Sequence, residues 1–148
     1  MPIVTLTTDF GLADHYVGVI KGVILGIAPR AALVDITHDV PPFSVNEGAF
    51  QISEAWRHFP KKTVHVVVVD PGVGSERRPI LVEADGQFFV GPDNGVLSLI
   101  YGGAKAAAKV KVRQITNQKL FGPRMSTTFH GRDVFAPVAA HLAKGMKP

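Results

Sequence analysis

The chain alternates between short runs of consecutive apolar residues and longer segments in which apolar residues recur every three or four positions. The first pattern is typical of buried strands, and the second is typical of helices that pack on a sheet. Residues 63–69 form the clearest run, because they are almost all β-branched. The strands predicted in this way are 3–8, 32–36, 63–69, 80–84, 87–90 and 110–115.

Apolar stripes predict helices between these strands. Asp14 is a suitable N-cap for a first helix, which Ala28-Pro29 would end. A short helix is predicted over 96–101, a loop over 117–128, and a last helix that begins near Asp133. A second helix is predicted between Pro42 and Pro60. The apolar faces expected to pack on the sheet are Tyr16, Ile20, Val23 and Ile27 in the first helix, Ala49, Ile52, Trp56 and Phe59 in this second helix, and Val134, Val138 and Leu142 in the last.

The order of these elements predicts an α/β fold. Strand, helix, strand, helix, strand is typical of a mostly parallel sheet with helices on both faces. Asp85-Gly86, between two strands, predicts a tight hairpin within that sheet. We therefore expect residues 1–148 to form a single α/β domain, with 144–148 resembling a linker that is cut short.

Composition narrows the class of protein. With 148 residues, 46% of them hydrophobic, the chain is long enough for one substantial core. The formal net charge of +4 comes from scattered Lys and Arg, and the densest cluster, 105–113, is predicted to be a solvated face with no nucleic-acid partner. No cysteine and no apolar run of nearly twenty residues occur, so we expect a soluble cytoplasmic protein without a membrane partner.

Polar residues gather where the predicted strands end. The clusters are 7–11, 37–39, Asp70 with Arg77 and Arg78, 93–94, and 129–133. The carboxyl ends of parallel strands meet at one edge of a sheet, which is where α/β proteins bind ligands. Each cluster also has a structural interpretation: Asp9, His38, Asp39 and Asn94 suit turns, Asp133 suits a helix N-cap, and His130 could be a core histidine.

Familiar nucleotide motifs are missing. Gly72 and Gly74 lack the third glycine of the dinucleotide fingerprint, and no Walker-type phosphate loop occurs. No Ser or Cys lies in a nucleophile elbow.

Four motifs together resemble the S-adenosylmethionine (SAM) hydroxide adenosyltransferases, relatives of the halogenating enzymes that use SAM. The motifs are TTDFG (7–11), DPGVG (70–74) with Arg77 and Arg78 after it, PDNG (92–95) and FHGRD (129–133). The resemblance implies a Rossmann-like N-terminal domain, a β-rich C-terminal domain that these 148 residues lack, and a homotrimer with substrate between subunits. It also implies attack of water or hydroxide on the 5′ carbon of SAM, which releases adenosine and L-methionine.

The resemblance implies a set of site residues. These are catalytic Asp70, Arg77 and His130, and substrate-binding Asp9, Phe43, Asn94 and Phe129. Asp9 would hold the ribose hydroxyls, while Phe43 and Phe129 would lie against the sugar and adenine. Arg78 is an alternative to Arg77 because the two are adjacent.

The chemistry suits these residues without a metal or cofactor. A sulfonium is already a cationic leaving group, so only water needs activation. Imidazole titrates near neutral pH, so His130 is the predicted base, with Asp70 orienting the water and Arg77 fixing the carboxylate. A carboxylate at position 70 would repel a halide, which disfavours halogenation.

Two alternatives remain open at this point. A metal-dependent phosphoesterase would use oxygen and nitrogen ligands, here Asp9, His38, Asp39, Asp70, Asn94 and His130, although their spacing matches no familiar ligand pattern. A non-catalytic nucleoside-binding domain is the other alternative, because the missing second domain would help to hold the substrate.

Overall fold

A computed structural model describes residues 1–103 and 109–148. The described residues form a six-stranded sheet in the order β2-β1-β3-β5-β4-β6. Strands β1, β2, β3 and β5 are parallel, and β4 runs antiparallel to both β5 and β6. The strands are β1 Ile3–Thr8, β2 Ala32–Thr37, β3 Val64–Val68, β4 Pro79–Ala84, β5 Gln87–Pro92 and β6 Lys111–Gln114. The mostly parallel α/β fold is thus confirmed.

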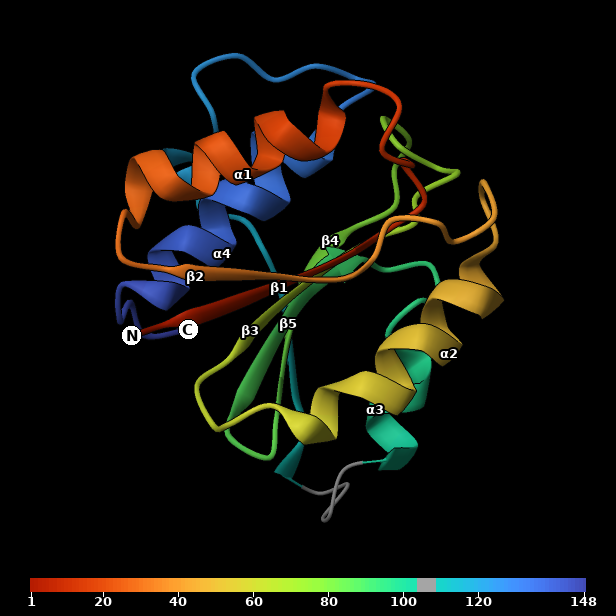
Figure 1. The fold of residues 1–148 in the computed structure, drawn as a ribbon, viewed down its shortest axis with the longest axis vertical. Coiled ribbons are helices and arrows are strands. Elements are labelled where there is room, and N and C mark those ends of the chain that lie inside the picture. The colour runs from red at the N-terminus through yellow and green to blue at the C-terminus, as the bar shows by residue number, and fades with distance from the viewer. Residues whose placement is uncertain (104–108) are drawn as a thin grey trace.

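Helices cover both faces of the sheet (Figure 1). On one face lie α1 and α4, and on the other lie α2 and α3. The helices are α1 Tyr16–Ile27, α2 Val45–Ala55, α3 Ser98–Gly103 and α4 Ala136–Ala143. A π-helical turn, Gly131–Phe135, leads directly into α4, and 3-10 turns occupy Trp56–His58 and Gln118–Leu120.

Two apolar clusters hold these layers together. Under α1 and α4, side chains such as Leu6, Ile20 and Phe135 are buried, and under α2 and α3 the cluster includes Trp56 and Phe89. Every residue of β3 is buried, as its β-branched sequence predicts for a central strand covered on both sides.

The predicted apolar face of α1 is confirmed in part, since Ile20, Val23 and Ile27 pack on the core and Tyr16 does not. His15, not Asp14, precedes its first residue, and the His15 side chain makes no capping hydrogen bond. Its buried residues are Val17, Ile20 and Ile24. Tyr16 is 40% exposed, because it lines the cavity described below instead of packing on the sheet.

The last helix does begin near Asp133, but Asp133 is not its N-cap. Asp133 lies inside the π-helical turn, where its carboxylate is buried and bonded to Arg132 and Ser126, so it does not act as an N-cap. Helical structure begins earlier, at Gly131. At the end of α2, a 3-10 turn replaces the last predicted helical residues and leaves Phe59 outside the helix.

The turn and surface predictions have mixed outcomes. Asp85 and Gly86 both have positive φ, 49° and 77°, and link the antiparallel β4 and β5 as predicted. In the basic segment 105–113, residues 105–108 lie outside the described residues, while Lys111 and Arg113 are exposed on β6. Within the described part of the chain, no helix has the length and apolarity needed to cross a membrane.

Candidate active site

A cavity of about 360 Å³ opens where β1 and β3 end. These parallel strands deliver Asp9 and Asp70 to the same edge of the sheet, as predicted. The loop before α4 supplies the opposite wall. The lining residues are Asp9, Phe10, Tyr16, Pro42, Phe43, Val68, Asp70, Val73, Thr128, Phe129, His130 and Gly131.

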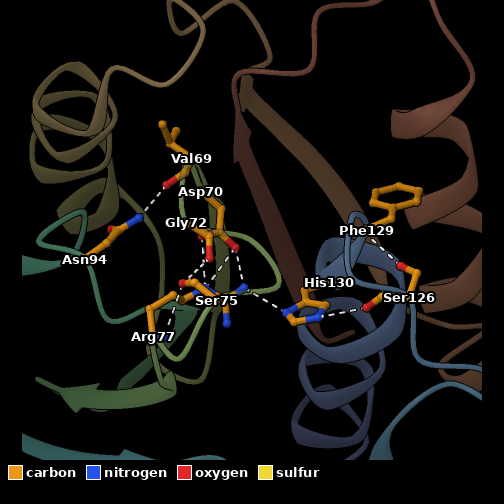
Figure 2. A network of polar contacts seen from close by, with 9 residues as sticks. All are labelled: Val69, Asp70, Gly72, Ser75, Arg77, Asn94, Ser126, Phe129 and His130. Atoms are coloured by element: carbon orange, nitrogen blue, oxygen red, sulfur yellow. Dashed lines mark hydrogen bonds and ion pairs between the residues drawn. The ribbon is translucent and has the colours of Figure 1, made fainter.

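Arg77 lies between Asp70 and His130, which both line this cavity (Figure 2). Its Nε donates to both carboxylate oxygens of Asp70, at 3.0 and 3.1 Å, and its Nη2 also donates to Oδ2. The same Nη2 lies 2.8 Å from Nδ1 of His130. The Asp70 and Arg77 side chains are only 5% and 9% exposed, so the pair is largely screened from water. Asp70, Arg77 and His130, predicted as a set, therefore form one continuous network.

The contacts of His130 define its protonation state. A guanidinium can only donate, so Nδ1 must accept from Arg77. Nε2 lies 3.0 Å from the carbonyl oxygen of Ser126, which can only accept, so Nε2 carries the proton. The ring is therefore neutral and both of its nitrogens are engaged, which leaves neither free to take a proton from water in this arrangement.

The turn from Asp70 to Arg77 folds back on itself and docks against the loop before α4. Ser75 hydroxyl donates to the Gly72 carbonyl and accepts from the Arg77 amide. Gly74 has a φ of +78°, and a Cβ atom there would lie 2.2 Å from the carbonyl oxygen of Thr127. Only glycine fits this position, because it permits both the backbone conformation and the close approach that brings Arg77 to His130.

Asp133 holds the other side of this contact. Its Oδ2 accepts from the Ser126 amide at 2.8 Å, and Arg132 donates to both of its oxygens. Burial alone would raise the pKa of Asp133, but the hydrogen bonds from Arg132 and Ser126 outweigh it and lower the pKa. The ionised carboxylate fixes Ser126, which in turn accepts from His130 and from the Phe129 amide.

Asp9 and Phe43 contact each other in the wall of the cavity. The Phe43 amide donates to Oδ2 of Asp9 at 2.8 Å, and the other carboxylate oxygen has no hydrogen bond to the described residues. Phe43 has a φ of 64°, an unusual conformation for a bulky residue, and its side chain is largely exposed at the rim. Such strain is common where a loop is shaped for ligand binding.

An aromatic group also lines the cavity. Phe129 makes edge contacts with Phe10 and Tyr16, at centroid distances of 5.8 and 5.2 Å. Phe129 was a predicted site residue, but Phe10 and Tyr16 were missed. Tyr16 was assigned to the core face of α1, and only its position in the first helical turn, close after the TTDFG motif, could have indicated otherwise.

The structure does not bring Asn94 into the cavity. Its amide donates to the Val69 carbonyl and its Oδ1 accepts from the Val96 amide. In Figure 2, Asn94 lies on the side of Val69 and Asp70 away from His130. Arg78 likewise faces elsewhere, since it pairs with Asp93 and its side chain is 64% exposed. Arg77 and not Arg78 is therefore the partner of Asp70.

The predicted metal ligands do not converge. His38 is bonded to Thr8 and lies against Asp35, while Asp39 is exposed. Asp70 is already paired with a cation, which would compete with a metal ion. Within residues 1–103 and 109–148, no group of three or more His, Asp or Glu side chains could hold a metal ion. This geometry does not favour the phosphoesterase alternative.

Comparisons with known proteins agree with the motifs at this cavity. An (R)-S-adenosyl-L-methionine hydrolase from Salinispora arenicola is 48% identical over 147 residues, which are 97% of this chain and 54% of the relative. A fluorinase from an Actinoplanes species is 27% identical over 97% of this chain and 55% of the relative. The solved structure of an uncharacterized conserved protein from Thermotoga maritima matches with a TM-score of 0.91 and 47% identity, covering 98% of this chain and 55% of that one.

The chain therefore spans about half the length of the curated relatives it matches. A family model described as the SAM hydroxide adenosyltransferase N-terminal domain matches residues 4–148. That match covers nearly the whole chain and includes all four motifs. The chain belongs to the SAM hydroxide adenosyltransferase family.

Proposed function

We propose that this chain hydrolyses SAM to adenosine and L-methionine, by attack of water or hydroxide on the 5′ carbon. The observation that carries the proposal is the continuous network of Asp70, Arg77 and His130 beside a cavity that also contains Asp9 and Phe129. The proposal treats residues 1–148 as one catalytic α/β domain. It includes a cytoplasmic location and, for the full-length protein as the family resemblance implies, a homotrimer.

In the proposed mechanism, Asp70 orients the attacking water. Its carboxylate lines the cavity and accepts one O–H of the water, so that an oxygen lone pair faces the 5′ carbon. The guanidinium of Arg77 supplies a positive charge behind that carboxylate, which favours hydroxide character in the water. Methionine leaves as a neutral thioether when the C5′–S bond breaks, so no acid is needed, and the proton of the water is released to solvent.

The contacts of His130 suggest a different role from that of general base. Because Nδ1 accepts from Arg77 and Nε2 donates to Ser126, taking a proton from water would require the ring to release one of these partners. We therefore assign His130 to holding the Arg77 guanidinium against Asp70. Asp70, Arg77 and His130 remain the proposed catalytic set.

The other end of the cavity suits a nucleoside. The Asp9 oxygen without a partner among the described residues could accept from the ribose hydroxyls. Phe43, Phe129, Phe10 and Tyr16 offer aromatic surface for the sugar and the adenine. With a nucleoside bound against them, these groups would help to exclude bulk water from the reacting centre, which would strengthen the electrostatic effect of Arg77.

Product analysis tests this function directly. The chain is incubated with SAM, and the mixture is separated by chromatography. We expect adenosine and methionine in equal amounts, no 5′-halogenated nucleoside when chloride or fluoride is added, and no effect of a chelator. Strict dependence on a divalent ion would favour the phosphoesterase alternative. Adenosine binding without any release from SAM would favour a non-catalytic nucleoside-binding domain.

A further inference from the structure

His38 does not line the cavity, but it contacts the strand end that carries Asp9. Its side chain is 2% exposed. Nδ1 lies 2.7 Å from the hydroxyl of Thr8, the last residue of β1. Nε2 lies 2.9 Å from Oδ1 of Asp35 in β2, although its N–H is not aligned well enough with that oxygen for a hydrogen bond. His38 is therefore a buried histidine that lies between Thr8 of β1 and Asp35 of β2, next to the segment that lines the cavity.

An irregularity in the sheet brings these groups together. In the pairing of β1 with β2, Leu6 lies opposite Asp35 but Thr7 lies opposite Thr37, so one residue of β2 is skipped. In a regular strand, residues three apart point to opposite faces. The extra residue reverses the alternation, and Asp35 and His38 therefore share the face of Thr8.

The donor and the acceptor in each of these contacts can be assigned, from Lys21 through to the Phe10 amide. Lys21 of α1 donates to Oδ2 of Asp35 at 2.7 Å. Burial alone would raise the pKa of Asp35, but the hydrogen bond from Lys21 and the nearby His38 ring outweigh it and lower the pKa. Since the ionised carboxylate only accepts, the proton of a neutral His38 belongs on Nε2. Nδ1 then accepts from the Thr8 hydroxyl, whose oxygen in turn accepts from the Phe10 amide at 3.3 Å.

Backbone hydrogen bonds tie the same two loops together. The Gly11 amide donates to the His38 carbonyl at 2.7 Å, and the Val40 amide donates to the Thr8 carbonyl at 3.4 Å. Asp9 and Phe10, which both line the cavity, are thus fixed on each side, at Thr8 and at Gly11. The loop after Val40 carries Phe43, whose amide holds the Asp9 carboxylate.

We infer that His38 is a positioning residue for the nucleoside end of the site, acting through Thr8 and the Gly11 amide to hold Asp9, Phe10 and Phe43 in place. This inference rests on the proposed function for its substrate. It separates the site into two parts, because none of the hydrogen bonds of the Asp70, Arg77 and His130 network reaches His38. Loss of His38 should therefore weaken nucleoside binding and leave the attack on the 5′ carbon almost unchanged.

The test compares His38→Ala and His38→Gln with His58→Ala, a substitution of an exposed histidine remote from the cavity. The Gln amide has an acceptor and a donor spaced like the two ring nitrogens, so it should restore most of the effect. Thr8→Val removes the hydrogen bond to His38 without emptying the space of the ring, and it replaces His38→Ala if that variant does not fold. Because it also removes the acceptor of the Phe10 amide, only the Gly11 and Phe43 amides are compared in this variant. Amide hydrogen exchange, adenosine affinity, and KM and kcat for SAM are measured for each variant.

In His38→Ala we expect about tenfold faster exchange at the Phe10, Gly11 and Phe43 amides and about tenfold weaker adenosine binding. KM should rise similarly, while kcat changes by less than about threefold. Unchanged exchange and affinity in both His38→Ala and Thr8→Val would overturn the inference, as would a loss confined to kcat. If the wild-type chain neither binds adenosine nor releases it from SAM, the proposed function fails, whereas the exchange rates still decide whether His38 holds these loops.

Discussion

His65 and His130 each have both ring nitrogens hydrogen-bonded, yet they belong to two very different regions of the molecule. His65 lies in the centre of the sheet, where Thr5 contacts Nδ1 and Gln87 contacts Nε2, both at 2.7 Å. Its partners are neutral, and its ring stacks on Phe89. His130 lies at the end of the sheet, where one of its partners is the charged Arg77.

The two regions also differ in what assembles them. Thr5 lies directly opposite His65 in the pairing of β1 with β3, so strand register alone brings the two together. The network at His130 depends on two loops docking against each other where Gly74 meets Thr127. A histidine fixed by register contributes to stability, whereas one fixed by docked loops beside a cavity can serve chemistry. Substitutions in the two regions should therefore separate stability from activity.

The largest expected effect is on activity, from Arg77→Lys. Lysine keeps the charge near Asp70, but a single ammonium cannot reproduce the planar set of bonds to Asp70 and His130. We expect kcat for adenosine release to fall by about a thousandfold, comparable to the loss of a preorganised electrostatic group in other enzymes. The free energy of unfolding should fall by only about 1 kcal/mol, because the ion pair is retained.

Arg78→Lys is the matched control for that change. Arg78 is adjacent in sequence but forms an exposed pair with Asp93, so we expect wild-type activity and stability. Steady-state kinetics and urea unfolding measure both quantities. Equal losses of activity in the two variants would remove Arg77 from its proposed role.

The next largest expected effect is on stability, and it arises from His65 in the core region. Burial lowers the pKa of His65 from 6.5 to about 4, and the hydrogen bond to Gln87 offsets only part of this. Between pH 6.5 and about pH 4, His65 binds a proton in the unfolded chain but not in the folded chain, so the free energy of unfolding decreases as the pH falls. The shift corresponds to a loss of about 3 kcal/mol between pH 7 and pH 4.

Urea unfolding of the wild type and of His65→Gln at both pH values measures this contribution. Glutamine can hydrogen-bond but does not titrate, so the wild type should lose about 3 kcal/mol more than the variant as the pH is lowered. His58→Gln, at an exposed histidine, should leave the wild-type pH dependence unchanged. Parallel pH profiles for the wild type and His65→Gln would show that His65 is not the group responsible.

His130→Asn distinguishes a general base from a residue that holds Arg77. Asparagine Oδ1 can take the place of Nδ1 and accept from Arg77, but it cannot accept a proton from water at neutral pH. We expect His130→Asn to retain kcat within about tenfold of the wild type, and His130→Ala to lose about a hundredfold. If kcat falls by the same large factor in both variants, the base role predicted from the sequence is restored.

The sequence predicted the sheet well because its signals are local and strong. The β-branched run of β3 and the Asp85-Gly86 turn each depend on neighbouring residues only, and both are confirmed. The role of Asp133 could not be predicted in this way, because its carboxylate accepts from the Ser126 amide across a loop and from the Arg132 side chain, and not from a backbone amide of its own helix.

The site was predicted from motifs rather than from local pattern, and this has a physical limit. Motifs brought Asp70, Arg77 and His130 together correctly, since all three belong to one network. They could not indicate which atoms of His130 are engaged, nor that Asn94 turns toward Val69. No pattern gave Tyr16 or His65 its observed place, and although Phe10 and His38 lie in the clusters 7–11 and 37–39, the contacts that they make between distant segments could not be predicted.

Gly74→Ala gives the smallest expected effect and tests the docking of the two loops. Its Cβ would meet the Thr127 carbonyl, and its φ of +78° disfavours any side chain, so we expect a loss of about 2 kcal/mol in unfolding free energy. The loops can relieve the clash by moving apart, which would lengthen the contact from Arg77 to His130 and lower kcat by about tenfold.

Gly26→Ala is the control, because a Cβ at that position of α1 meets nothing within 4 Å, and alanine there should stabilise the helix by about 0.5–1 kcal/mol. Since the core network around His65 does not touch these loops, its pH dependence should be the same in both glycine variants. A change in that pH dependence in Gly74→Ala would mean that the two regions are coupled through the sheet.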